Sequence, residues 1–193
     1  MRDFAPLLLL SVATLVGDTA NSADIADQDA AVLSAVAEKY CSDTDSPYVV
    51  LESIAARPPD YLDDWLQAIH VQKEDALSLK NRNPSGTGLP PDAEYKCLRV
   101  TESAIIDRAF KTKPKHFKKE PERTPEWAAF YEAFPKAKGV MTLSLPAYLA
   151  TGNEAIVYVS LECGSLCGTG YIYSLLHASG TWTVTKKTML WIS

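Results

Sequence analysis

The sequence lacks the motifs that usually identify an enzyme, and it is poor in the residues that build metal centres. Its 193 residues include 3 histidines and 4 cysteines, and no G-x-S-x-G, H-E-x-x-H or S-x-x-K motif occurs. Four cysteines are far fewer than a disulfide-dense scaffold needs, so a hydrophobic core must carry the fold. With 47% hydrophobic and 22% charged residues, the composition excludes disorder and collagen and fits one globular domain.

Long apolar runs are also scarce, and the one that stands out lies near the N-terminus. Residues 4–16 are mostly apolar, and small and polar residues follow at 17–23. As a helix, such a run spans roughly 20 Å, short of the roughly 30 Å hydrocarbon core of a bilayer. This layout is typical of a secretory signal peptide. We predict a signal peptide at residues 1–22, and an exported protein, periplasmic or secreted, that keeps no transmembrane anchor after cleavage.

Charge is unevenly distributed along residues 23–193, which we expect to form a single domain. Acidic residues prevail at 24–75 and basic residues at 76–138, whereas the remainder is balanced. Residues 108–123 are especially basic and are interrupted by prolines, which predicts a mobile basic loop. Its basic residues are Arg108, Lys111, Lys113, Lys115, Lys118, Lys119 and Arg123.

The basic loop has two interpretations. In the first interpretation, the loop binds an anionic partner, such as phosphate, lipopolysaccharide or an acidic protein. Alternatively, it is a solvated loop that partly neutralises the acidic N-terminal third of the same chain. Nucleic acid is disfavoured as a partner, because the chain is acidic overall and is expected to be exported.

Helical periodicity dominates the first two thirds of the chain. Apolar residues recur at steps of three and four over 24–40 and over 61–69, which predicts two amphipathic helices. A short helix is expected after Glu102. Another begins with Thr124 as its cap and Pro125 in its first turn, and it carries an aromatic face.

The last third of the chain changes to the period of two that strands require. A short strand at 48–51 and a loop at 81–91 are also expected. The four later strands follow one another through short turns, which favours an antiparallel meander. They are expected at 141–145, 155–162, 170–177 and 181–192. We therefore predict an α+β fold in which N-terminal helices pack on a C-terminal four-stranded antiparallel β-meander.

The predicted core draws on one helix and on the strands, because their apolar residues share a face. The aromatic residues of the helix after Thr124 are interpreted as core and not as a ligand platform. The expected core residues are Trp127, Phe130, Tyr131, Val157, Val159, Leu161, Trp182 and Val184.

The four cysteines allow three disulfide connectivities, and export favours their oxidation. Cys163 and Cys167 lie in the connection between two strands, where a chain reversal can bring them within disulfide distance. That pairing leaves Cys41 with Cys97. Two alternatives are a zinc site that includes His177 and a redox-active dithiol, but ligands are too few for the first and the three-residue spacing is unusual for the second.

The C-terminal third resembles a family of uncharacterised exported bacterial proteins over residues 126–193. The resemblance rests on Trp127-x-x-Phe130-Tyr131, Phe134-Pro135, Gly139, Leu143-Ser144, Ala155-x-Val157-Tyr158-Val159, Cys163-Gly-Ser-Leu-Cys167-Gly-x-Gly170, Trp182-x-Val184 and Trp191-Ile192-Ser193. Relatives carry Gly-Phe-Asn where this chain has Ala147-Tyr148-Leu149. The resemblance implies export, the cysteine unit and the α+β fold, and it assigns no activity.

We therefore expect a non-catalytic module that binds a protein or an anionic component of the bacterial envelope, with no cofactor and no metal. One alternative is a hydrolase without a recognisable motif, and the other is a thiol-dependent envelope protein. The candidates for a hydrolytic site are Ser160, Ser165, Ser174, His70, His116 and His177.

Overall fold

The computed structural model describes residues 22–41, 48–59, 71–115 and 124–193. Several sequence-based predictions fall on the rest of the chain. The signal peptide and the helix at 61–69 lie outside the described residues. So do five of the candidate site residues: Lys118, Lys119, Arg123, His70 and His116.

The helices agree with most of the periodicity in the sequence. In the described part of the chain they are α1 (Ser22–Ala37), the 3-10 helix η1 (Glu38–Tyr40), α3 (Lys73–Arg82), α4 (Ser103–Lys111) and α5 (Pro125–Ala133). Thr124 occupies the N-cap of α5, but its hydroxyl caps no backbone group. The Thr124 hydroxyl instead donates a hydrogen bond to the carboxylate of Glu126, and this bond lowers the pKa of Glu126.

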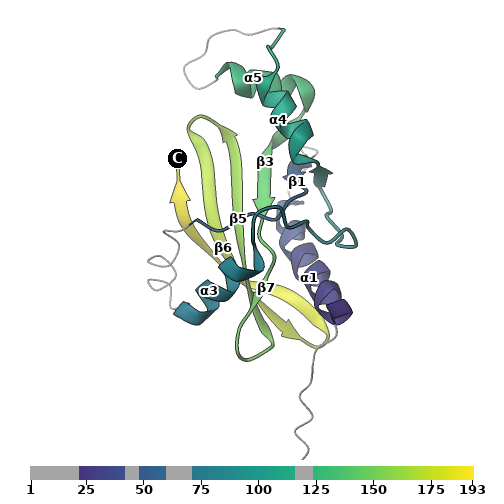
Figure 1. Cartoon of the computed structure of the whole chain (residues 1–193), viewed down its shortest axis with the longest axis vertical. Helices are drawn as coiled ribbons and strands as arrows, with labels where there is room; N and C mark the ends of the chain where they lie inside the picture. The colour runs from purple at the N-terminus through teal and green to yellow at the C-terminus, as the bar shows by residue number, and fades with distance from the viewer. Residues whose placement is uncertain (1–21, 42–47, 60–70, 116–123) are drawn as a thin grey trace, which may run out of the picture.

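A mixed sheet forms the centre of the molecule (Figure 1). Its strands are β1 (Tyr48–Glu52), β2 (Leu98–Thr101), β3 (Ala137–Leu143), β4 (Ala147–Tyr148), β5 (Glu154–Gly164), β6 (Cys167–Ala178) and β7 (Thr181–Ile192). Their order is β2-β1-β3-β5-β6-β7, and β4 pairs with β5. The α+β class is confirmed.

The predicted four-stranded antiparallel meander is wrong as a description of the whole sheet, which is mixed and has seven strands in the described part of the chain. The segments β3, β5, β6 and β7 do pair antiparallel in that order. However, β1 adds parallel to β3, and β2 adds parallel to β1. The two added strands are only five and four residues long. Runs this short show little periodicity, and parallel partners lie far apart in the sequence.

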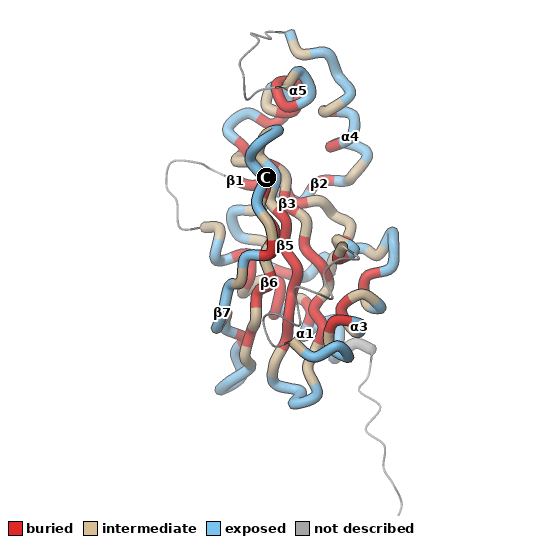
Figure 2. The backbone as a smooth tube through the Cα atoms, turned by 90° about the vertical axis from the view of Figure 1, so that its left-hand side faces the viewer, coloured by how far each residue is buried: buried red, intermediate tan, exposed pale blue. Residues whose placement is uncertain are grey.

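Helices cover both faces of the sheet, so packing is not confined to N-terminal helices on one side. On one face, Val32 and Val36 of α1 pack against a cluster that includes Val157 of β5. On the other face, Leu79 of α3 packs with Ile156, the neighbour of Val157 along β5. Figure 2 shows the buried residues concentrated in the strands of the sheet.

The pair of α4 and α5 covers the β1 end of the sheet, on the same face as α3. Val50 of β1 packs with Ile106 of α4 and Phe130 of α5, whereas Val49 belongs to the α1 side. Figure 1 shows α4 and α5 together at one end of the long axis, above β1 and β3.

The helix α3 was not predicted from the sequence. The expected loop at 81–91 begins inside α3, because residues 81 and 82 are helical. Only Ala76 and Leu79 of α3 are buried, so the helix shows too little apolar periodicity to be recognised. Within the described residues, no helix is long and apolar enough to cross a bilayer.

Candidate binding site

An aromatic cluster joins α4 to α5 and shapes the space between them. The ring of Phe110 stacks on that of Phe130 with centroids 5.0 Å apart, and it meets Trp127 edge-on at 5.0 Å. Phe130 is fully buried, and Trp127 and Phe134 are nearly so. The aromatic face of α5 is therefore core, as expected, except for Tyr131, which is only partly buried.

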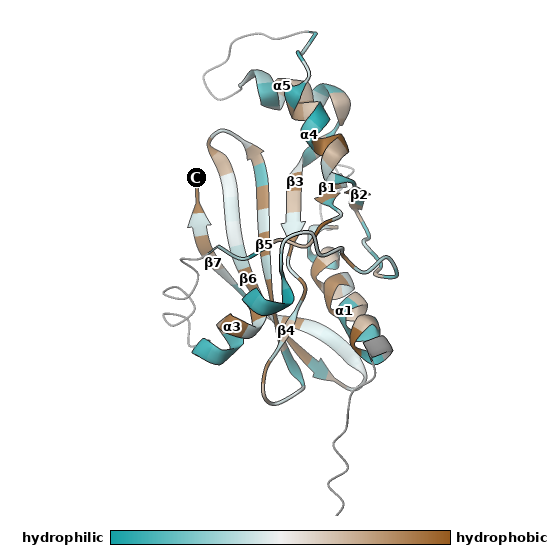
Figure 3. Cartoon of the chain, viewed as in Figure 1, coloured by the Kyte–Doolittle hydropathy of each residue, from teal (hydrophilic) through white to brown (hydrophobic). Residues whose placement is uncertain are grey.

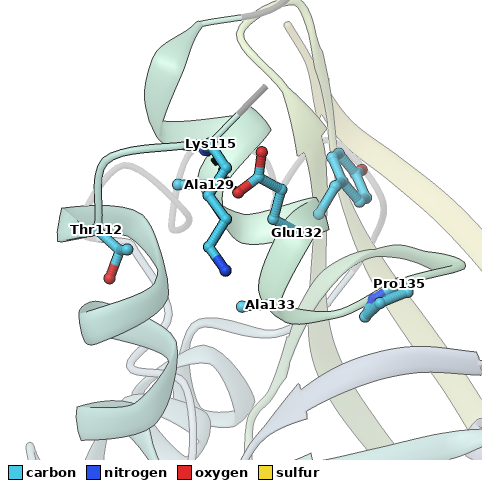
Figure 4. Close-up of a pocket in the computed structure, with 7 residues that line it drawn as sticks. Thr112, Lys115, Ala129, Glu132, Ala133 and Pro135 are labelled. Carbon is cyan, nitrogen blue, oxygen red and sulfur yellow. Dashed lines mark hydrogen bonds between the residues drawn. The ribbon is translucent and has the colours of Figure 1, made fainter. Parts of the chain in front are cut away.

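A pocket of about 400 Å³ opens beside this cluster (Figure 4). Apolar groups form much of its wall, and a lysine and a glutamate lie at its opening. The lining residues are Thr112, Lys115, Ala129, Tyr131, Glu132, Ala133 and Pro135. The helix α5 and the residues that follow it form the wall of the pocket, and the basic segment after α4 forms its rim. Several residues separate these two segments in the sequence.

Two hydrogen bonds fix the edges of the pocket. The backbone N–H of Lys115 donates to Oε2 of Glu132 at 2.8 Å, which ties the segment after α4 to α5. The hydroxyl of Thr112 donates to the carbonyl oxygen of Arg108 at 2.7 Å, at the end of α4. Figure 4 shows Lys115 and Glu132 next to each other at the opening between the helices. The ammonium group of Lys115 forms no ion pair with any described residue.

The basic residues expected in one mobile loop lie partly on a helix. Arg108 and Lys111 belong to the last turn of α4, so the predicted loop at 108–123 is wrong for residues 108–111. The reason is the spacing of Ile106, Ala109 and Phe110, which places an apolar face on the aromatic cluster. Lys113 and Lys115 follow the helix and are exposed.

The surface around the pocket is positively charged. Residues 103–115 and 124–138 contain six basic and three acidic residues. Lys111 forms an exposed ion pair with Asp107 at 3.6 Å, which contributes little to stability. Clustered excess charge of one sign raises the local concentration of oppositely charged ligands. This end of the molecule is therefore suited to an anion.

The disulfide at the tip of the β5–β6 hairpin lies next to α5. Cys163 and Cys167 are paired with Cα atoms 5.1 Å apart, and Cys41 is paired with Cys97 at 5.2 Å. All four cysteines are thus oxidised, in the connectivity expected. The Tyr131 hydroxyl donates to the carbonyl oxygen of Cys163 at 2.9 Å, so the hairpin tip is anchored to a pocket residue.

The glycines after Cys167 have a packing role that the sequence did not reveal. A Cβ added to Gly170 would lie 1.9 Å from Nε1 of Trp191, and one added to Gly168 would lie 3.0 Å from the same indole. The indole N–H donates to the hydroxyl of Tyr158 at 3.2 Å. The N–H of Ser193 donates to the carbonyl oxygen of Gly168 at 2.9 Å. The segments Cys167-Gly-x-Gly170 and Trp191-Ile192-Ser193 therefore form one structural unit.

The serines and the histidine considered for hydrolysis are not brought together in the described part of the chain. The hydroxyl of Ser160 shares a 2.8 Å hydrogen bond with that of Thr142. Ser160 of β5 pairs with Gly170 on the neighbouring strand β6. His177 lies seven residues further along β6, roughly 23 Å away. His177 stacks on Trp182 with centroids 5.0 Å apart, and Ser165 lies in the distant hairpin tip.

The described residues also provide no evident geometry for a metal site or for reactive thiols. Among residues 22–41, 48–59, 71–115 and 124–193, no group of three His, Cys, Asp or Glu side chains could hold a metal ion. Cys163 and Cys167 lie at the ends of two strands, whereas reactive thiols are usually activated at helix N-termini. The hydrolase and thiol-dependent alternatives stay predictions without a geometric basis.

Comparisons of the chain with known protein families, with curated proteins and with solved structures found no match.

Proposed function

We propose that the protein is a non-catalytic binding module, which holds an anionic group of an envelope component in the pocket between α5 and the segment after α4, here called the α4–α5 pocket. One observation carries this proposal. An open pocket of about 400 Å³ combines an apolar wall with a lysine at its opening, on a surface where basic residues outnumber acidic ones.

The pocket favours a ligand that has both an anionic and an apolar part. The aliphatic and aromatic groups of Ala129, Ala133 and Tyr131 provide apolar contact. The carboxylate of Glu132 is held by the backbone N–H of Lys115, and the charge of a ligand would meet the ammonium group of Lys115 at the rim. Lys113 is exposed two residues earlier on the same segment and adds a second positive charge nearby. A carboxylate and a phosphate both fit this chemistry.

Export is part of the proposal. It is supported by the signal-like segment at residues 1–22, by the resemblance of residues 126–193 to exported proteins, and by two disulfides. Disulfides persist mainly in oxidising compartments. An envelope component is therefore the partner that the chain would meet.

Binding of two anionic probes to the oxidised full chain tests the proposal. The probes are hexaglutamate and vesicles that contain phosphatidylglycerol, with phosphatidylcholine vesicles as the neutral reference. We expect binding to at least one anionic probe and to no neutral vesicle, and we expect the affinity to fall with added salt. Preference for hexaglutamate would indicate an acidic protein segment, and preference for the anionic vesicles would indicate a lipid phosphate.

Paired charge reversals assign the binding to the pocket. The variant Lys113→Glu/Lys115→Glu should weaken binding at least about tenfold, because two attractions of about 0.5–1 kcal/mol each are lost and are replaced by repulsions. Lys39→Glu/Lys73→Glu changes the net charge equally at exposed positions of η1 and α3, and it should have little effect. Equal losses in the two variants would show only a general charge effect and would contradict a site at the pocket.

A further inference from the structure

The strand β7 has a long open edge. Its 12 residues pair with β6, and no described strand pairs with its other side. The N–H of Ser193 donates to Gly168 of β6. Because peptide groups alternate along a strand, the N–H and C=O of Ile192 point to the open side. An edge of this kind can accept another strand through backbone hydrogen bonds.

Apolar residues gather at the C-terminal end of this edge. Met189 and Ile192 are 49% and 71% exposed, and Figure 3 shows this end of β7 as hydrophobic. A second cavity, of about 460 Å³, is lined by residues 189–192 alone. The open backbone groups of Ile192 therefore lie among exposed apolar side chains that an added strand could contact.

The charges of β7 indicate which strand it would accept. The strand contains Lys186 and Lys187, both exposed, and no acidic residue. The ammonium group of Lys187 lies 3.8 Å from the ring centroid of Tyr171, on the side of the sheet that α1 covers. A second copy that paired symmetrically along the whole strand would place the lysines of the two copies opposite each other. Like charges in opposite positions destabilise a strand pair.

We propose that the open edge of β7 binds an extended segment of a partner protein, in which acidic residues lie beside the two lysines and apolar residues follow beside the C-terminal end of the strand. Acidic residues would pair with Lys186 and Lys187, and apolar residues would contact Met189 and Ile192. The edge is a different surface from the α4–α5 pocket, and this proposal does not depend on the function proposed for that pocket.

A short synthetic peptide with glutamates in one half and valines in the other tests the proposal on the oxidised full chain. Fluorescence anisotropy measures its affinity, and amide hydrogen exchange shows which backbone groups become protected. We expect saturable binding and slower exchange of the Ile192 amide. A peptide with lysine in place of glutamate should bind at least about tenfold more weakly, and so should a peptide with N-methyl groups at alternate residues, which remove backbone donors.

Protein variants locate the contact. Lys186→Glu and Ile192→Asp should each weaken binding of the valine–glutamate peptide at least about fivefold. Lys73→Glu and Leu77→Asp are the matched controls, because both residues lie exposed on α3, and these variants should bind normally. The variants at Lys113 and Lys115 should also bind normally, so failure of the pocket proposal would leave this result unchanged.

Three outcomes would overturn the proposal. The first is absence of binding at millimolar peptide, and the second is equal binding of the glutamate and lysine peptides. The third is a concentration-dependent dimer in analytical ultracentrifugation that Ile192→Asp abolishes, which would assign the edge to a second copy of the chain.

Discussion

At the scale of single residues, one buried carboxylate connects three elements of the fold. Asp29 of α1 is 4% exposed, and its carboxylate lies 2.7 Å from the guanidinium of Arg82 at the end of α3. The hydroxyl of Tyr148 in β4 donates to the same carboxylate at 2.8 Å. Burial, together with the negative charge of Asp29, raises the pKa of Tyr148. Tyr148 therefore stays a hydrogen-bond donor at neutral pH.

Removing the charge of Asp29 should be costly. Asp29→Asn keeps the shape of the side chain but leaves Arg82 without its charged partner, although its bond to the carbonyl oxygen of Pro146 remains. Breaking a buried ion pair costs about 3–5 kcal/mol, and since the Arg82 side chain is 24% exposed, we expect about 2–3 kcal/mol. Urea unfolding measures the loss. Asp27→Asn is the control, because Asp27 is an exposed residue of the same helix. Equal stability of the two variants would show that the network is not stabilising.

The contact between glycine and tryptophan can be tested in the same way. Gly170→Ala places a Cβ where the Trp191 indole lies, so the indole must move and lose its bond to Tyr158. We expect a loss of about 1–3 kcal/mol, as for other overpacked sites, with a change in tryptophan fluorescence. Gly88→Ala should be neutral, because nothing lies within 4 Å of the added Cβ. In a Trp191→Leu background, Gly170→Ala should cost much less, and an undiminished cost would refute the contact.

At the scale of elements, the two disulfides act at different ranges. Cys41–Cys97 joins the end of η1 to the residue before β2 and closes a sequence separation of 56, whereas Cys163–Cys167 closes a separation of 4. The first therefore links distant elements, and the second constrains one hairpin tip. The difference in loop length predicts different contributions to stability.

Replacing each cysteine pair by serine should reveal this difference. In the chain-entropy model, loss of Cys41–Cys97 costs about 4 kcal/mol and loss of Cys163–Cys167 about 2 kcal/mol. Urea unfolding of the two double variants gives both values on the same scale. A larger cost for the short loop would mean that Cys163–Cys167 acts mainly by holding the hairpin against Tyr131 and not through chain entropy.

Elements with a strong local pattern could be predicted from the sequence, and those that depend on distant partners could not. The helix α1 and the strands β5, β6 and β7 repeat their apolar residues over 10 residues or more. By contrast, β2 contains only Leu98–Thr101 and gains its place from pairing with β1. Likewise, the run of basic residues predicted a basic surface but not the pocket. The pocket depends on a hydrogen bond between Lys115 and Glu132, which are 17 residues apart in the sequence.

At the scale of the whole molecule, the sheet separates two candidate binding surfaces. The α4–α5 pocket lies at the β1 side of the sheet, whereas β7 is the opposite edge strand. Figure 1 shows the two regions apart, with the aromatic helices above β3 and the C-terminus beyond β6. Both surfaces carry basic residues on a chain whose net charge is −5. The chain can thus attract acidic partners locally despite its overall charge.

The central claim is that the α4–α5 pocket binds an anionic ligand, and an amide chemical-shift titration of the oxidised protein with hexaglutamate and with short-chain phosphatidylglycerol tests it most directly. For at least one of the two ligands, we expect saturable shifts at Thr112, Lys115 and Glu132, and we expect Lys113→Glu/Lys115→Glu to need at least about tenfold more ligand for the same shifts. With both ligands, shifts that are absent from these residues, or that saturate at the same ligand concentration after the charge reversal, would contradict the proposed function.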